Sequence, residues 1–269
     1  MRRFILLGHK APISPDFILN DLPGSGGRLD VLCRAIGATF FLSHGLRRDS
    51  ELTLLLQNQV QIRFVGERLR GLNPDERSTA GLIKNALEKL TDKEVESTPG
   101  IFISRGDLPT VLDHLYQKRA QPVLLHEDGI PIDSYQPPAN PAFVLSDHIE
   151  FTESELDTFS ELPRISLGEQ SLHASQCITI VHYLFDKRDR EDKSSLQLCH
   201  KVWGEPKARL IQGLLKDFDI PANLITQVPP SVLPMTIDGL AEVRIMVREH
   251  DLARAKEIIA DYFEEPTQE

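Results

Sequence analysis

The first 185 residues alternate short apolar runs with amphipathic stretches. Apolar runs of four or five residues between polar or glycine-containing turns are typical of buried strands, and apolar residues spaced three and four apart are typical of helices. We therefore predict strands at 4–8, 40–43, 52–56, 101–104, 122–126, 142–145 and 164–167. Helices are predicted at 28–35, 73–90, 108–116 and 175–185, with Asn73 as an N-cap. This alternation indicates an α/β domain with a mainly parallel sheet.

A second pattern follows a nearly all-polar segment at 187–195, which we interpret as a helix end and a linker. A strand is predicted at 198–203, a helix at 205–218, strands at 222–227 and 241–247, and a helix at 251–263 that Asp251 caps. We therefore predict two domains, 1–192 and 198–269, the second a small α+β domain.

Composition narrows the class of protein. Hydrophobic residues make up 41% and charged residues 26%, as in folded soluble domains. The apolar runs are far shorter than the roughly 20 residues of a membrane span, and the first residues do not resemble a signal peptide. We expect a cytoplasmic protein with no membrane association. Three widely spaced cysteines without a CxxC pair indicate neither a disulfide framework nor a metal site.

Charge is unevenly distributed along the chain. The net charge is −10, which weighs against a nucleic-acid partner, but residues 1–90 carry 13 Lys and Arg against 9 Asp and Glu. A local basic face can bind phosphates on an acidic protein. A glycine-rich turn at 24–27 precedes a predicted helix and could hold an RNA phosphate, although a plain flexible turn explains it equally well.

Six ordered segments of the chain resemble one family. They are GHKA at 8–11, DLPG at 21–24 leading into GRLDVL at 27–32, FLSHG at 41–45, LNPDERST at 72–79, HEDG at 126–129, and ISLG at 165–168 followed by LHA at 172–174. Together they resemble the tRNA pseudouridine-54 N1-methyltransferases (the TrmY family) of the SPOUT superfamily. The resemblance covers residues 1 to about 190.

The resemblance implies an S-adenosylmethionine-dependent RNA methyltransferase that modifies N1 of a pseudouridine in tRNA. It also implies a SPOUT-type parallel sheet with a C-terminal deep trefoil knot, an exception to the rule against knotted chains, and a homodimer. Residues 198–269 resemble small uncharacterised ferredoxin-like domains described as possible signalling modules, which leaves their role open. Two alternatives remain: methyl transfer to another RNA base or ribose, and a non-catalytic RNA-binding or regulatory dimer.

Strand ends provide the expected cofactor site, because ligands of such sheets bind at the carboxyl ends of the strands. An adenine needs backbone hydrogen bonds and an apolar slot. The residues that we expect to bind S-adenosylmethionine are Leu145, Ser146, Ile165, Leu167, Gly168, Leu172 and Cys177. Without the resemblance, these would be ordinary strand-to-helix turns.

Arg28 and Asp30 are the candidate catalytic residues. A carboxylate near the target nitrogen can accept its proton or orient the base, and an arginine can hold a carbonyl or a phosphate. The alternative is a pair of surface charges. Two departures from the family pattern concern the cofactor loops: Ser146 stands where the family has glycine, and Ser175-Gln176 replaces Asp-His.

Overall fold

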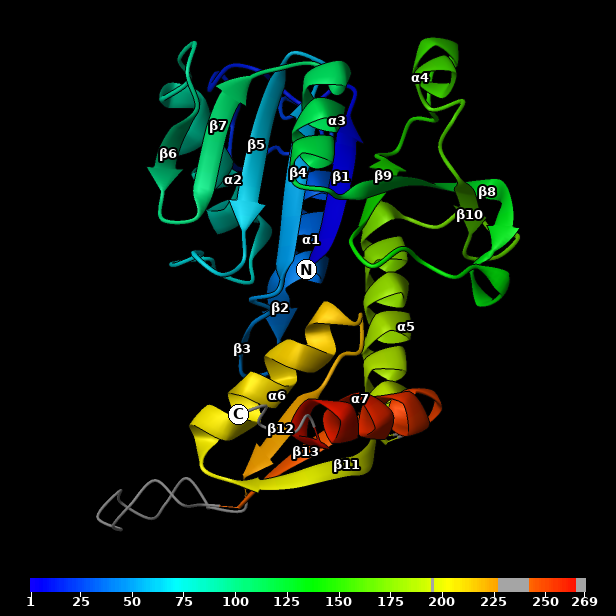
Figure 1. The fold of residues 1–269 in the computed structure, drawn as a ribbon. Helices are drawn as coiled ribbons and strands as arrows, with labels where there is room; N and C mark the ends of the chain where they lie inside the picture. Colours follow the sequence, from blue (N-terminus) through cyan, green and yellow to red (C-terminus); the bar gives the residue numbers. More distant parts are fainter. Residues whose placement is uncertain (195, 227–241, 265–269) are drawn as a thin grey trace. The chain divides into compact units, whose positions relative to one another are not determined.

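The computed structural model describes residues 1–194, 196–226 and 242–264. The chain divides into two compact units, an N-terminal unit Met1–His182 and a C-terminal unit Tyr183–Glu269 (Figure 1). Within the described ranges, no helix combines the length and the apolar character that crossing a membrane requires.

An eight-stranded sheet forms the centre of the N-terminal unit, in the order β10-β8-β9-β1-β4-β5-β7-β6. Its strands are β1 (Arg2–Gly8), β4 (Ser50–Leu56), β5 (Val60–Val65), β6 (Val95–Thr98), β7 (Ile101–Arg105), β8 (Gln121–Pro131), β9 (Pro141–Ser146) and β10 (Arg164–Ser166). The helices are α1 (Leu29–Phe40), α2 (Glu76–Glu88), α3 (Leu108–Gln117), η1 (Ile132–Ser134), α4 (Glu153–Thr158) and α5 (Ala174–Ser194). A separate hairpin pairs β2 (Phe41–Leu42) with β3 (Gly45–Leu46).

The sheet has a parallel and an antiparallel part. Strands β10, β8, β9, β1 and β4 pair in parallel, which confirms the α/β prediction. Strands β5, β7 and β6 add antiparallel pairings, and the sequence patterns did not predict β5 or β6. The turn from β4 to β5 places Gln57 and Asn58 at φ of 46° and 53°, which reverses the chain directly.

Two local predictions need correction. The strand predicted at 40–43 is only the two-residue β2, which pairs with β3 outside the main sheet, because α1 continues through Phe40, whose buried ring lies against Phe64 with centroids 6.4 Å apart. Helix α2 begins at Glu76 rather than near Asn73. Its N-cap is Asp75, whose carboxylate accepts a 2.7 Å hydrogen bond from the amide of Ser78.

Helix α5 is longer than the sequence predicted. The predicted helix ended at residue 185, and the polar segment from 187 was interpreted as a helix end and linker, but α5 runs to Ser194. Charged residues with good helix propensity can extend an exposed helix beyond its apolar part.

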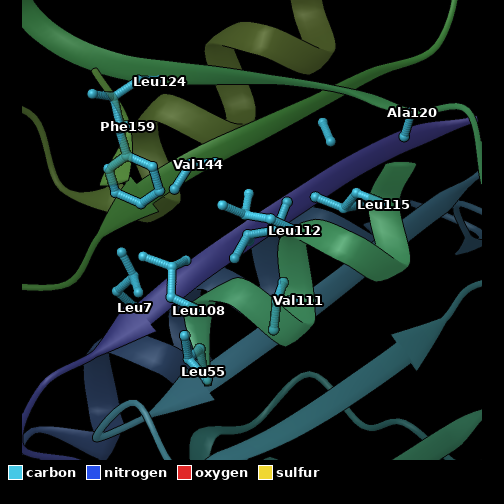
Figure 2. Packing of buried hydrophobic residues seen from close by; sticks show 12 residues of the cluster. Leu7, Leu55, Leu108, Val111, Leu112, Leu115, Ala120, Leu124, Val144 and Phe159 are labelled. Atoms are coloured by element: carbon cyan, nitrogen blue, oxygen red, sulfur yellow. The ribbon is translucent and has the colours of Figure 1, made fainter. Parts of the chain in front are cut away.

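Strand β1 is buried along its whole length, and its successive side chains point to opposite faces of the sheet. On one face, Ile5 and Leu7 pack against α3, whose Leu108, Leu112 and Leu115 recur at helical spacing (Figure 2). Each fully buried side chain of this size contributes about 1.5–3 kcal/mol. This packing fixes the carboxyl ends of β1 and β9.

The C-terminal unit is a small α+β fold, as predicted. Its elements are β11 (Leu196–Trp203), α6 (Glu205–Asp217), β12 (Asn223–Thr226), β13 (Glu242–Arg248), η2 (Glu249–Asp251) and α7 (Leu252–Glu264). The sheet order is β11-β13-β12, and both pairings are antiparallel. Buried residues of α6 and α7 share one core with the alternating residues Val243, Ile245 and Val247 of β13. Residues 227 and 241, the inner ends of two predicted strands, lie outside the described residues.

Candidate functional site

A pocket of about 620 Å³ opens at the carboxyl ends of β9 and β10 and beside β8. This is the edge of the sheet at which the parallel strands predicted a ligand site. All seven residues predicted to bind the cofactor line this pocket: Leu145, Ser146, Ile165, Leu167, Gly168, Leu172 and Cys177. Its volume lies within the roughly 300–1,000 Å³ range of small-molecule sites.

Further residues line the pocket that sequence reasoning did not assign to it. Glu127 and Asp128 come from β8, Glu150 from the loop after β9, and Leu156 from α4. The HEDG segment at 126–129 was a usable signal, because it follows a predicted strand. The carboxylates give the pocket a negative rim beside its apolar wall.

The loop after β9 is closed by its own polar groups. The hydroxyl of Ser146 donates to the carbonyl oxygen of Ile149, and the amide of Ile149 donates to Asp147 Oδ1 over 2.9 Å. The serine that replaces the family's glycine therefore has its hydroxyl engaged within the loop. Gly168 meets the pocket at φ +138°, and a Cβ added there would have no atom within 4 Å, so its backbone leaves open space for a ligand.

The N-terminus of α5 closes another side of the pocket. Gln176, one of the departures from the family pattern, accepts a 2.9 Å hydrogen bond from the amide of His173 and so caps the helix. Burial raises the pKa of Cys177 to about 11, which keeps its thiol protonated. Among the described residues, no group of three or more His, Cys, Asp or Glu side chains could hold a metal ion.

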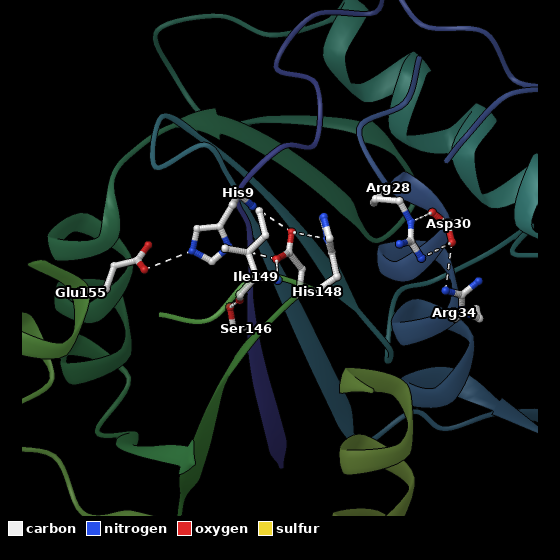
Figure 3. Close-up of polar contacts among 9 residues, drawn as sticks. His9, Arg28, Asp30, Arg34, Ser146, His148, Ile149 and Glu155 are labelled. Carbon is white, nitrogen blue, oxygen red and sulfur yellow. Dashed lines mark hydrogen bonds and ion pairs between the residues drawn. The ribbon is translucent and has the colours of Figure 1, made fainter. Parts of the chain in front are cut away.

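His9 lies between two carboxylates at the end of β1 (Figure 3). Its Nδ1 lies 3.0 Å from Asp147 Oδ1 and its Nε2 lies 3.1 Å from Glu155 Oε2. Its amide also donates to Asp147 Oδ2 over 3.0 Å. His9 thus ties α4, which contributes Leu156 to the pocket, to the loop after β9.

The His9 network should make stability depend on pH. The hydrogen bonds from His9 to Asp147 and to Glu155 raise the pKa of His9 from 6.5 to about 9, although burial of the ring opposes this shift. Protonated His9 therefore stabilises the fold fully below pH 6.5, and this stabilisation is lost as the pH rises through about 9. We expect His9→Gln to lower the melting temperature by several degrees at pH 6.5, and the difference from the wild type to shrink above pH 9.

Thermal unfolding from pH 6 to pH 10 would measure this effect. The exposed His44 provides the matched control, and His44→Gln should follow the wild-type curve throughout. A His9→Gln curve parallel to the wild type at every pH would contradict the prediction, since it would mean that any stabilisation by His9 does not depend on its protonation.

The two candidate catalytic residues contact each other. Arg28 Nε donates to Asp30 Oδ1 over 3.0 Å, and Arg28 Nη2 donates to Asp30 Oδ2 over 3.2 Å (Figure 3). Arg34 donates to the same carboxylate over 3.0 Å. Arg28 has a φ of +67°, which is uncommon outside glycine and requires support from its surroundings. Gly27 beside it also has a positive φ, and a Cβ there would lie 1.9 Å from the Lys10 carbonyl oxygen.

The Arg28–Asp30 pair interacts electrostatically with Asp147, which lines the pocket. Asp30 and, to a smaller extent, Asp147 raise the pKa of the Arg28 guanidinium. Burial alone would raise the pKa of Asp30, but the hydrogen bonds from Arg28 and Arg34 outweigh it and hold that pKa below its ordinary value. A carboxylate in this state is a weak proton acceptor, so the geometry favours a role for Asp30 in orienting Arg28.

Several basic residues of the first ninety are neutralised within the N-terminal unit. Arg63 pairs with Glu94 and Arg68 with Glu96, both at 2.8 Å. Arg48 instead donates to backbone carbonyl oxygens of Gly66 and Leu69. Fewer arginines of the first ninety residues are therefore free to bind phosphate than the count of basic residues in the sequence indicates.

The glycine-rich turn at 24–27 is also occupied. Asp21 accepts hydrogen bonds from the amides of Gly24, over 3.1 Å, and Ser25, over 2.8 Å. A phosphate would have to displace this carboxylate, so the turn does not form the open phosphate cradle that we considered from the sequence.

Comparisons with known proteins agree on a family for the first 190 residues. The family model described as "Putative SAM-dependent RNA methyltransferase" matches residues 1–190, and one described as "Putative prokaryotic signal transducing protein" matches residues 205–262. The tRNA (pseudouridine(54)-N(1))-methyltransferase of Haloferax volcanii is 47% identical over 192 residues, which cover 69% of this chain and 96% of that protein. The enzyme of the same name from Methanococcoides burtonii is 46% identical, with 70% and 96% covered.

The fold is similar to a solved structure. The crystal structure of Archaeoglobus fulgidus Nep1 bound to S-adenosylhomocysteine matches with a TM-score of 0.52 and 15% sequence identity. The match covers 69% of this chain and 97% of that one. At this identity the likeness shows the fold, and it supports the SPOUT-type architecture expected for the N-terminal unit.

Proposed function

Because the chain belongs to the family of putative S-adenosylmethionine-dependent RNA methyltransferases, we propose that it methylates N1 of a pseudouridine in tRNA. The observation that carries the proposal is the pocket at the strand ends, which collects all seven residues expected to bind the cofactor. The substrate follows from the names of relatives that are 42–47% identical to this chain.

The pocket residues fit S-adenosylmethionine. The apolar side chains of Leu145, Ile165 and Leu172 would hold the adenine, and the open backbone at Gly168 leaves room beside it. The rim carboxylates, Glu127 among them, complement the cofactor's positive charges. When bound, the cofactor supplies a methyl group on a positively charged sulfur.

The protein's own contribution is positioning. Arg28 would donate its guanidinium hydrogen bonds to a carbonyl oxygen of the target base, and Asp30 would hold that guanidinium in place. The base nitrogen loses its proton to water as the N–C bond forms and the C–S bond breaks. Holding the two reactants in line can lower the barrier by roughly 7–11 kcal/mol.

The family resemblance supports further proposals. We propose that residues 1–192 form the methyltransferase domain with a C-terminal trefoil knot, that residues 198–269 are an accessory domain, and that the protein is a cytoplasmic homodimer. Analytical ultracentrifugation tests the dimer, since a single species at the monomer mass would contradict it.

Calorimetry and a transfer assay test the proposed function together. We expect S-adenosylmethionine and S-adenosylhomocysteine to bind at one site per chain. Labelled methyl should then transfer to a tRNA that carries pseudouridine at the target position. A matched tRNA with uridine there should remain unlabelled, because N1 of uridine carries the ribose and has no proton to exchange for a methyl group. Equal labelling of both would favour another base or a ribose, and failure to bind either cofactor form would favour the regulatory alternative.

A further inference from the structure

The C-terminal unit contains a groove that the methyltransferase site does not use. It has a volume of about 470 Å³ and lies between β11 and α7, at the edge of the three-stranded sheet. Five consecutive residues of β11, from Cys199 to Trp203, line it, so the strand's backbone forms one wall. The other wall is one face of α7, on which Lys256, Ile259 and Phe263 recur at helical spacing. We refer to it as the β11–α7 groove.

Exposed aromatic rings line this groove. Trp203 is 61% exposed and Phe263 is 55% exposed, which is unusual for side chains of this size. Phe263 stacks on His200, with centroids 6.3 Å apart and ring planes 16° apart. These rings offer flat faces to a ligand, and the exposed fractions show that the described residues leave them accessible.

The groove is also basic within an acidic protein. Lys201, Lys207 and Lys256 line it. Lys201 lies 3.5 Å from Glu242, whereas neither Lys207 nor Lys256 has an ion-pair partner anywhere in the described part of the chain. The N-terminal unit differs, because arginines such as Arg63 and Arg68 are paired with glutamates there. The groove therefore offers positive charge that is not already neutralised.

We propose that the β11–α7 groove binds a single-stranded segment of the RNA substrate. Bases would stack on Trp203 and Phe263, while phosphates pair with Lys207 and Lys256, which is the chemistry of sequence-tolerant RNA binding. Charge complementarity and the exposed rings of Trp203 and Phe263 carry the inference. It rests on the proposed function in that the ligand is the RNA that the enzyme methylates, and it gives the C-terminal unit a role in holding that RNA.

Fluorescence of the full-length protein tests the proposal, because Trp203 is the only tryptophan of the chain. Titration with a single-stranded oligoadenylate of about eight nucleotides should quench this fluorescence saturably. With the two unpaired lysines at about 0.7 per phosphate, log K should fall with log salt with a slope of about −1.4. Combining Lys207→Gln with Lys256→Gln should weaken binding about tenfold and bring the slope to about zero.

The matched control is Lys216→Gln, which removes an exposed lysine from the other end of α6, outside the groove. It should leave quenching unchanged. The proposal is overturned if the oligonucleotide does not quench, or if the double variant binds as tightly as the control. Quenching by free AMP as strong as by the oligonucleotide would also overturn it, since the ligand would then be a free nucleotide.

These outcomes are independent of the methyltransferase proposal, because the titration needs neither cofactor nor methyl transfer. Methyl transfer to tRNA without quenching would contradict the groove assignment alone. Quenching by RNA in a protein that binds no S-adenosylmethionine would contradict the proposed enzyme and leave RNA binding in place.

Discussion

Replacing Asp147 with asparagine is expected to weaken S-adenosylmethionine binding about 100-fold and to lower the melting temperature by several degrees. The Asp147 side chain is fully buried and accepts hydrogen bonds from the His9 amide, the His9 ring and the Ile149 amide. Removing one partner of a buried charge pair costs about 3–5 kcal/mol. That cost falls on the free energy of unfolding. A 100-fold loss of affinity corresponds to about 2.8 kcal/mol, at about 1.4 kcal/mol for each factor of ten, so the ligand would have to restore much of the lost order of the pocket wall.

We expect this effect because the loop after β9, which lines the pocket, would no longer be held in one conformation. Asparagine keeps one acceptor oxygen, so it can serve the Ile149 amide and the His9 ring or the His9 amide, but its NH2 group must then face a donor at the other position. Protonated His9 also keeps only Glu155 as a negatively charged partner. Ligand binding would then have to order this loop at a cost in conformational entropy. Calorimetry with S-adenosylhomocysteine, together with thermal unfolding, measures both effects.

Asp128→Asn is the control for the charge change. Asp128 also lines the pocket, but its side chain is 86% exposed and its ion pair with His126 is 3.8 Å long. Exposed pairs of this kind contribute about 0–1 kcal/mol, so we expect less than about a fivefold change in affinity. If both variants bound the cofactor equally well, the Asp147 network would have no part in shaping the pocket.

The second large effect is expected on catalysis. Arg28→Lys should reduce the rate of methyl transfer about 100-fold while leaving cofactor affinity unchanged, because small misplacement of a reactant can cost that much. Lysine keeps the positive charge but cannot reproduce the two-pronged contact with Asp30. Asp30→Asn should reduce the rate similarly, since the guanidinium would lose its anchor.

Single-turnover transfer of labelled methyl to tRNA separates this role from a structural one. Arg28 and Asp30 do not line the pocket, so calorimetry should give wild-type affinity for S-adenosylhomocysteine in both variants. Arg77→Ala, which removes an exposed arginine of α2, is the control and should retain the full rate. Full single-turnover activity of Arg28→Lys would remove Arg28 from the target-base site.

Local patterns predicted most of the elements because strand and helix periodicity is a property of neighbouring residues. Strand β1 and helix α3 were identified from apolar spacing alone. One strand was missed although a local signal for it was present. Val60–Val65 was not identified as β5, but its apolar residues at 60, 62 and 64 alternate with polar ones, which is the pattern of a strand.

The sequence determined by itself the α/β class, the small second domain, the family and the loops that form the pocket. Only the tertiary structure decided how charges are paired. His9 meets Asp147 and Glu155 across 138 and 146 residues, and Arg63 meets Glu94 across 31. The β11–α7 groove likewise joins segments about 55 residues apart. Periodicity reports which face of an element is apolar, whereas ion pairs and grooves depend on strand register and on the approach of distant segments, which no local pattern encodes.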